Sequence, residues 1–325
     1  MGINYRVDNW FLGYERSINP KKSGGGGGRT FKPGTGIKNL QAAGLKKPEV
    51  MVKIPKRTGN SSGMKGVKGH LEYISRNGSL TLENQDGQKI TGAKEIKDTL
   101  NEWRKFGIPE NSTKREALNI VFSMPPGTPA QAVKDAVREF TREQFQGHQY
   151  VFVEHTDEKH PHVHLAVSMR DELGKRMNPR KNDLFHWRVF FAEKMREQGV
   201  DCAATKRQHR GIAQKGDSAI VRQIEDRGKL SEVKKSQAQE LIQALKENKR
   251  PLHPFLKEHL ATKEMISEEY KYLAKELYKA GLKTEARAIS KLNQSVMQAD
   301  NTTKAQARFD DVIGRVTEKS VEIER

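Results

Sequence analysis

Four histidines stand within ten residues of this chain, in the segment HTDEKHPHVH at residues 155–164. Alternating apolar stretches flank the segment, at residues 150–153 and 165–167. This pattern predicts two neighbouring strands joined by a short polar turn that contains a proline. Because side chains alternate between the faces of a strand, His162 and His164 are expected on the same face. The fold must therefore include a strand pair that carries histidines near its turn.

The histidines of this hairpin have the composition of a metal site. His155 ends the first predicted strand and can converge on the face that carries His162 and His164. Three imidazoles from paired strands can hold a metal ion and leave positions open for water or substrate. Hydrogen bonds that fix the imidazole tautomers are expected from three residues in and beside the turn: Asp157, Glu158 and His160.

Composition restricts the partners and the compartment. The chain has 325 residues, with 59 Lys and Arg against 41 Asp and Glu, for a net charge of +18. Such a charge favours a polyanionic partner, nucleic acid first and an anionic membrane surface second. No apolar run approaches the roughly 20 residues of a membrane span. The single cysteine, Cys202, excludes a disulfide framework and a cysteine-rich zinc site, so we expect a soluble cytoplasmic protein.

Three segments differ in character along the chain. Residues 1–49 are basic and include five consecutive glycines, Gly24 to Gly28, which predicts a flexible arm. Residues 50–212 contain both strand-like and helix-like patterns, which predicts an α+β domain with an antiparallel sheet flanked by helices. Residues 213–325 are rich in Lys, Glu, Ala, Leu and Gln, which predicts an all-helical C-terminal domain.

One tyrosine stands out within the predicted α+β domain. Tyr73 lies in the segment HLEYISRNG at residues 70–78, near the end of a predicted helix that Asn77 and Gly78 should terminate. A phenol has a pKa near 10 and attacks only when a cation or base assists it. A helical tyrosine between Leu and Ile is also typical of half-buried packing, so its position alone leaves the role of Tyr73 open.

The tyrosine and histidine segments together resemble the HUH-type relaxases of the MobA/VirD (MOB-P) class, the mobilization nucleases of conjugative or mobilizable plasmids. The resemblance lies in YISRNG at residues 73–78 and HTDxxHPHVH at residues 155–164. It continues through WRxxFAxxMRxxGV at residues 187–200 and ATxRxxRG at residues 204–211, and covers roughly residues 50–212. The tyrosine precedes the histidine pair as in relaxases, whereas replication initiators of the same superfamily have the opposite order.

The resemblance implies a fold and a chemistry. The fold is an HUH endonuclease core, with Tyr73 as the nucleophile that forms a 5′-phosphotyrosyl DNA intermediate. The implied cofactor is a divalent ion, Mn²⁺ or Mg²⁺, bound by three ligands: His155, His162 and His164. Asp157, Glu158 and His160 are implied as further catalytic groups, and the expected DNA contacts are Arg76, Arg207 and Arg210.

The implied partners are those of conjugative transfer. They are single-stranded or supercoiled origin-of-transfer DNA, accessory relaxosome proteins and a type IV secretion coupling protein, in the cytoplasm of a bacterium. For Arg207 and Arg210, the sequence alone favours a solvated charged loop over a specific DNA contact. The roles of the N-terminal segment and of the helical C-terminal segment stay open.

Other functions compete with this interpretation. The nearest is a rolling-circle replication initiator nuclease, which sequencing of the nick in a supercoiled plasmid distinguishes from a relaxase. A second alternative is a non-catalytic nucleic-acid-binding protein with a degenerate active site. The intact histidine set and the tyrosine argue against such a loss of catalytic residues. A cupin-like oxygenase needs a downstream Glu and Gly pattern that residues 165–171 lack, and leaves the basic charge unexplained.

Overall fold

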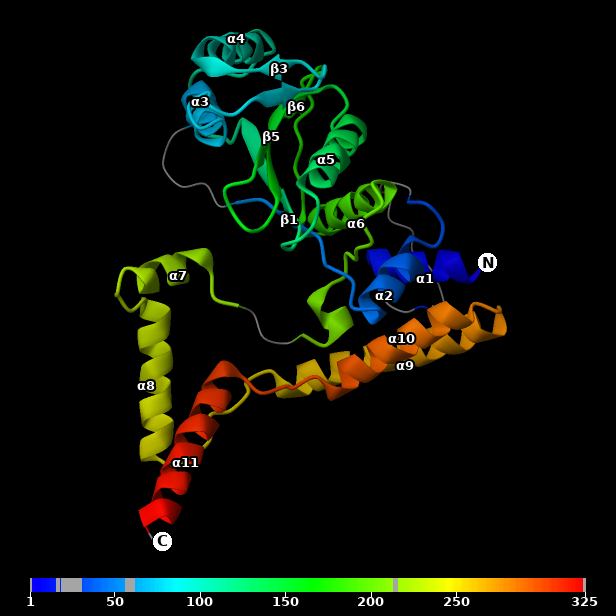
Figure 1. Cartoon of the computed structure of the whole chain (residues 1–325), viewed down its shortest axis with the longest axis vertical. Coiled ribbons are helices and arrows are strands. Elements are labelled where there is room, and N and C mark those ends of the chain that lie inside the picture. The colour runs from blue at the N-terminus through cyan, green and yellow to red at the C-terminus, as the bar shows by residue number, and fades with distance from the viewer. Residues whose placement is uncertain (1, 16–17, 19–30, 56–61, 213–215, 324–325) are drawn as a thin grey trace. The chain divides into compact units, whose positions relative to one another are not determined.

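The structure is a computed structural model that describes residues 2–15, 18, 31–55, 62–212 and 216–323 (Figure 1). Contacts divide the chain into two compact units. The first consists of Met1–Thr205 with Leu273–Ser290, and the second of Lys206–Tyr272 with Lys291–Arg325. The predicted domain limits at residues 49 and 212 differ from this grouping and stay predictions.

The first unit is built on an antiparallel sheet, as predicted. Within the described residues the sheet has six strands in the order β1-β4-β6-β5-β2-β3, and neighbouring strands pair antiparallel. The strands are β1 (Met51–Lys53), β2 (Leu82–Asn84), β3 (Lys89–Ile90), β4 (Ala117–Ser123), β5 (His148–His155) and β6 (His162–Asp171). The histidine segment is therefore the turn and the flanking residues of the central β5–β6 hairpin.

Helices cover both faces of the sheet (Figure 1). They are α3 (Gly63–Ile74), α4 (Gly92–Lys105), α5 (Ala130–Gln144) and α6 (Lys181–Glu197). Apolar residues of α3 and α4 pack in one cluster with Val151, Val153 and Ala166. On the other face, the ring of Phe122 lies 4.9 Å from that of Phe140 on α5 and 5.0 Å from that of Phe191 on α6. The predicted α+β class is confirmed.

The strand register decides which face carries the histidines. His155 pairs directly with His162, and Val153 pairs with His164. Because alternate residues share a face, His155 lies on the same face as Val153, which packs under α3 and α4. All three histidines therefore lie on the α3 side of the sheet.

The end of α3 is a tight turn with an unusual backbone. Arg76, Asn77 and Gly78 all have positive φ, at 52°, 56° and 90°. A Cβ on Gly78 would lie 2.8 Å from backbone atoms of Gly92, so glycine is required there by both conformation and space. The predicted helix stop at Asn77 and Gly78 is confirmed.

The prediction of a flexible N-terminal arm is wrong for the two described helices of that segment, α1 (Ile3–Leu12) and α2 (Thr35–Gly44). Phe11 is fully buried, and its ring lies 5.5 Å from that of Phe185 on α6. The Asp8 carboxylate accepts the backbone N–H groups of Gly34 and Gly36 at 2.8 and 2.6 Å and so joins α1 to the start of α2. Gly24 to Gly28 lie outside the described residues.

The predicted all-helical C-terminal segment is confirmed. It contains α7 (Ala219–Asp226), α8 (Glu232–Lys246), α9 (Leu256–Lys279), α10 (Lys283–Gln298) and α11 (Lys304–Ile323), and the short 3-10 helix η1 (Arg207–Arg210) precedes it. Within the second unit, α8 packs against α11, and the buried Tyr270 hydroxyl donates to the backbone carbonyl of His209 at 2.8 Å. Among the helices of the described residues, none is both long and apolar enough to cross a bilayer.

Candidate active site

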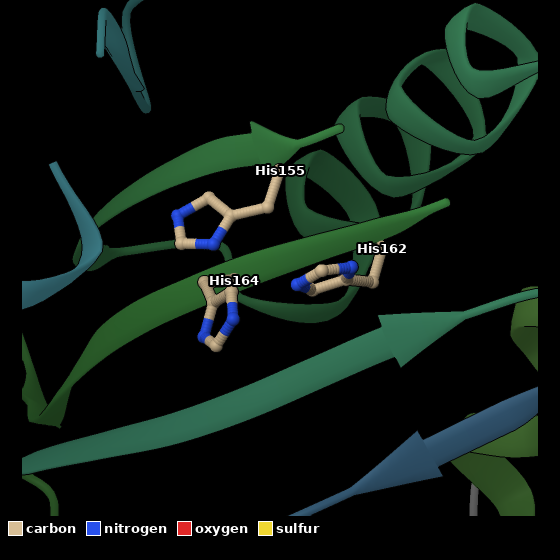
Figure 2. Close-up of side chains that lie close together, drawn as sticks. All are labelled: His155, His162 and His164. Carbon is tan, nitrogen blue, oxygen red and sulfur yellow. The ribbon is translucent and has the colours of Figure 1, made fainter. Parts of the chain in front are cut away.

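The three hairpin histidines meet on one side of the sheet. Figure 2 shows their rings gathered over the two adjacent strands that carry them. Ring centroids are 5.2 Å apart for His155 and His162, 4.5 Å for His155 and His164, and 5.2 Å for His162 and His164. One nitrogen from each ring lies within 4.8 Å of the corresponding nitrogens of the other two. The structure thus brings together the three residues predicted as metal ligands.

Hydrogen bonds fix the tautomers of two of these rings. His155 Nε2 lies 2.7 Å from the carbonyl oxygen of Ile74, and His162 Nδ1 lies 3.0 Å from that of His160. Because a carbonyl oxygen can only accept, these two nitrogens carry the protons. His155 Nδ1 and His162 Nε2 therefore keep free lone pairs, which is the donor set that a metal ion needs.

This arrangement corrects one sequence-based expectation. The side chains of Asp157, Glu158 and His160 were expected to fix the imidazole tautomers, but backbone carbonyls do so. All three side chains are exposed, and none of them is hydrogen-bonded to the imidazoles among the described residues. The carbonyl oxygen of His160, and not its ring, is the group bonded to His162 Nδ1. A wider catalytic role for the three side chains stays a prediction.

Burial and neighbouring charges keep two of the three rings in the neutral form. Burial, reinforced by the neighbouring His155 and His162, lowers the pKa of His164 to about 3. Burial also lowers the pKa of His155. Desolvation and nearby cations both disfavour a charged imidazole, so these two rings are neutral at physiological pH. Neutral imidazole is the form that binds a metal ion.

Tyr73, the predicted nucleophile, lies beside this cluster. It stands in the last turn of α3 with 60% of its surface exposed. The centroid of its ring is 6.4 Å from that of His164, with an interplanar angle of 80°. The structure therefore places an accessible phenol next to the three imidazoles, on the sheet face that α3 covers.

The predicted DNA-contacting arginines fall in two places. Arg76 lies at the active site, with its guanidinium carbon 5.8 Å from the centroid of the Tyr73 ring and its Nη2 2.5 Å from Oδ2 of Asp157. Arg207 and Arg210 lie in η1, which belongs to the second unit, and Arg207 is exposed.

A fourth histidine, His70, was missed by reasoning from the sequence. It lies one helical turn before Tyr73 on α3, and the amide nitrogen of Asn119 donates to its Nδ1 at 3.0 Å. Its Nε2 is buried and has no hydrogen-bond partner among the described residues. Burial lowers the pKa of His70 to about 4. Its three-residue spacing from Tyr73 could have indicated that both lie on one side of the helix.

The segment that contains the site matches a known family of nucleases. Residues 73–200 match the family model for the MobA/VirD2-like nuclease domain of relaxases, and the matched segment starts at Tyr73 and includes the histidine hairpin. The chain carries a MobA/VirD2-like relaxase domain. The relaxase domain of this chain thus has its tyrosine, its histidines and the connecting strands in one matched segment.

Individual relatives agree with the assignment of the relaxase domain. The chain is 28% identical over 178 residues to the T-DNA border endonuclease VirD2 of Rhizobium radiobacter, covering 48% of this chain and 42% of the relative. It is 28% identical over 181 residues to the T-DNA border endonuclease VirD2 of Agrobacterium fabrum strain C58, covering 48% and 40%. The chain therefore spans about two fifths of the length of these relatives.

Proposed function

We propose that the relaxase domain nicks one strand of DNA at a specific site within a plasmid transfer origin and thereby initiates conjugative transfer. The observation that carries this proposal is the position of Tyr73, exposed and with its ring 6.4 Å from that of His164 in the three-histidine cluster. A nucleophile beside a metal-binding cluster suits phosphoryl transfer. The match of residues 73–200 to relaxase nucleases supports the same chemistry.

The proposed reaction is a transesterification. The Tyr73 oxygen attacks the scissile phosphorus and loses its proton, while the 3′ oxygen of the preceding nucleotide leaves and is protonated. The products are a 5′-phosphotyrosyl strand and a free 3′-hydroxyl. Because one phosphodiester replaces another, the step can be reversed to reseal the strand, which hydrolysis by water would prevent. Arg76 can donate hydrogen bonds to the phosphate beside Tyr73.

His155, His162 and His164 would hold a divalent ion in this reaction. The lone pairs left free on His155 Nδ1 and His162 Nε2 support that assignment. When bound, the ion polarises the scissile phosphate and stabilises the charge that develops on it. Imidazole ligands bind Mn²⁺ more tightly than Mg²⁺. The greater abundance of Mg²⁺ in cells favours occupancy by Mg²⁺.

The proposed substrate is single-stranded or supercoiled origin-of-transfer DNA. The net charge of +18 supports a nucleic-acid partner, and the relatives are named as border endonucleases. The same role implies accessory relaxosome proteins, a type IV secretion coupling protein and a bacterial cytoplasm. Asp157, Glu158 and His160 are proposed as supporting catalytic groups, and Arg207 and Arg210 as DNA contacts.

Covalent trapping tests the proposal. The protein is incubated with Mn²⁺ and single-stranded DNA from the transfer origin of its plasmid, then denatured and resolved by electrophoresis. Wild type is expected to give a protein–DNA adduct, and Tyr73→Phe none, because that variant lacks only the attacking oxygen. Tyr278→Phe is the matched control, since Tyr278 is equally exposed but lies in α9. An undiminished adduct in Tyr73→Phe contradicts the assignment, and cleavage without an adduct in wild type indicates hydrolysis.

A further inference from the structure

An ion pair joins the two loops that border the candidate active site. Arg76 Nη2 and Asp157 Oδ2 are 2.5 Å apart, and the two side chains are about half exposed, at 45% and 54%. Arg76 follows the helix that carries Tyr73, and Asp157 follows the strand that ends at His155. The pair therefore connects the nucleophile's helix end to the histidine hairpin.

The backbone that presents Arg76 is held firmly. The N–H of Asn77 donates to the carbonyl of Glu72 at 2.8 Å, and the N–H of Gly92 donates to the carbonyl of Gly78 at 3.1 Å. Left-handed conformation is unfavourable for a non-glycine residue, and it persists only where the surrounding structure fixes it. Arg76 is such a residue. The guanidinium is thus supplied from a preorganised turn.

The guanidinium lies close to the nucleophile, and so to any phosphate that the nucleophile attacks. Its carbon is 5.8 Å from the centroid of the Tyr73 ring, and the Tyr73 oxygen can attack only a phosphorus that lies close to it. Guanidinium groups bind carboxylate and phosphate through the same pairs of N–H groups. An N–H of Arg76 that is bonded to Asp157 is not available to a phosphate oxygen.

We propose that Asp157 acts as a placeholder for a DNA phosphate: it holds Arg76 beside Tyr73 in the free protein and gives way to a backbone phosphate when single-stranded DNA binds. This inference rests on the proposed function of the site. It assigns Asp157 a positioning role through Arg76, in place of the tautomer-fixing role that the hairpin sequence suggested. Asp157 then has two effects. It competes with the DNA phosphate for Arg76, and it holds the Arg76 side chain in the position that the phosphate needs.

A double-mutant cycle on Arg76 and Asp157 tests the placeholder. All variants are made in Tyr73→Phe so that binding is measured without cleavage, by fluorescence anisotropy with a labelled oligothymidylate in EDTA. Asp157→Asn is expected to bind about two- to fivefold more tightly, the size of effect expected for release from an exposed ion pair. Arg76→Ala is expected to bind more weakly. When Arg76 is already replaced by Ala, the further change Asp157→Asn should raise the DNA affinity no more than the control variant does.

The control is Glu110→Gln. Glu110 is also an exposed carboxylate paired with an arginine, Arg104, outside the histidine site. The variant removes the same charge, so it measures the general electrostatic gain. Equal tightening by Asp157→Asn and Glu110→Gln, or tightening by Asp157→Asn that survives Arg76→Ala, overturns the placeholder.

Failure of the placeholder and failure of the proposed function have different signatures. If wild type forms the Tyr73 adduct but the cycle shows no coupling between Arg76 and Asp157, only the placeholder is wrong. If the cycle shows coupling but wild type forms no adduct with origin DNA, the transesterification is wrong while the binding role of Arg76 stands. Thermal unfolding of each variant confirms that the binding differences come from folded protein.

Discussion

His155 donates its Nε2–H to the carbonyl oxygen of Ile74, the residue directly after Tyr73, at 2.7 Å. The bond leaves His155 Nδ1 as the only nitrogen of that ring with a free lone pair. One contact thus orients a candidate metal ligand and ties it to the end of the helix that carries the nucleophile. The candidate metal site and the tyrosine are therefore connected through the backbone of α3.

Loss of one imidazole should weaken metal binding sharply. We expect His162→Ala to lower the affinity for Mn²⁺ by more than about 100-fold, because loss of a ligand should exceed the roughly 10- to 100-fold cost of losing a group that only orients one. Isothermal titration calorimetry measures the change. His148→Ala is the control, since His148 lies at the opposite end of β5, where its ring contacts the carbonyl of Ser168. Unchanged affinity in His162→Ala would remove that residue from the site.

The turn after Tyr73 should tolerate no side chain at Gly78. We expect Gly78→Ala to slow formation of the Tyr73–DNA adduct and to lower the free energy of unfolding, because its Cβ would meet the backbone of Gly92 at 2.8 Å. Single-turnover adduct assays and urea denaturation measure the two effects.

Gly87 supplies the control for the turn. It also has positive φ, at 76°, but a Cβ there meets nothing within 4 Å. Gly87→Ala therefore shares the conformational strain of about 1 kcal/mol and lacks the overlap. Similar adduct rates in the two variants would show that the close approach to Gly92 does not position Tyr73.

Acid should destabilise the fold through its buried histidines. Burial lowers the pKa of His209 to about 3, and the side chain is only 3% exposed. Since the folded pKa lies below the unfolded value of about 6.5, the unfolded state takes up a proton first as the pH falls. The stabilisation is complete above about pH 6.5 and is lost progressively toward pH 3. At pH 5.5 the loss is about 1.4 kcal/mol for one such histidine.

Urea denaturation at pH 7.5 and pH 5.5, followed by circular dichroism, measures this loss. His209→Gln cannot take up the proton, so its free energy of unfolding should fall less than that of wild type between the two pH values. Equal pH dependence in the two proteins would mean that His209 is charged in the folded state or does not titrate on unfolding.

A DNA contact by Arg207 should appear in the salt dependence of binding. Each phosphate neutralised on single-stranded DNA contributes about 0.7 to the slope of log affinity against log salt. We expect Arg207→Ala to reduce the slope by about that amount. Arg222→Ala, at an exposed arginine of α7 in the same unit, is the comparison. A slope unchanged from wild type would mean that Arg207 contacts no phosphate of the DNA.

Local periodicity predicted the part of the site that depends on neighbours in sequence. Alternation along a strand placed His162 and His164 on one face, and the structure confirms it. The convergence of His155 depends on the strand pairing that aligns it with His162, and the proline-containing turn indicated that pairing. The position of Tyr73 came from the family resemblance, since a tyrosine within a helix carries no such signal by itself.

Contacts between distant segments could not be predicted. The partner of His155 is the backbone of Ile74, and backbone carbonyls have no residue-specific signature in a sequence. The burial of α1 was not predicted for another reason. Glycines and positive charge dominate residues 1–49, and they conceal the helical spacing of Val7, Trp10 and Phe11, all of which are buried. The average composition of residues 1–49 therefore did not reveal the apolar face of α1.

The direct pairing of His155 with His162 makes the candidate ligand set a property of one hairpin. The tolerance to a one-residue insertion should therefore differ sharply between the turn of this hairpin and the strand that follows it. A residue added between His162 and His164 would turn one imidazole to the opposite face of the sheet and dismantle the cluster. A residue added between Thr156 and Pro161 would only lengthen the turn and leave the pairing intact. A scan of single-codon insertions should thus find length variation accepted at the tip of this hairpin and rejected two residues later.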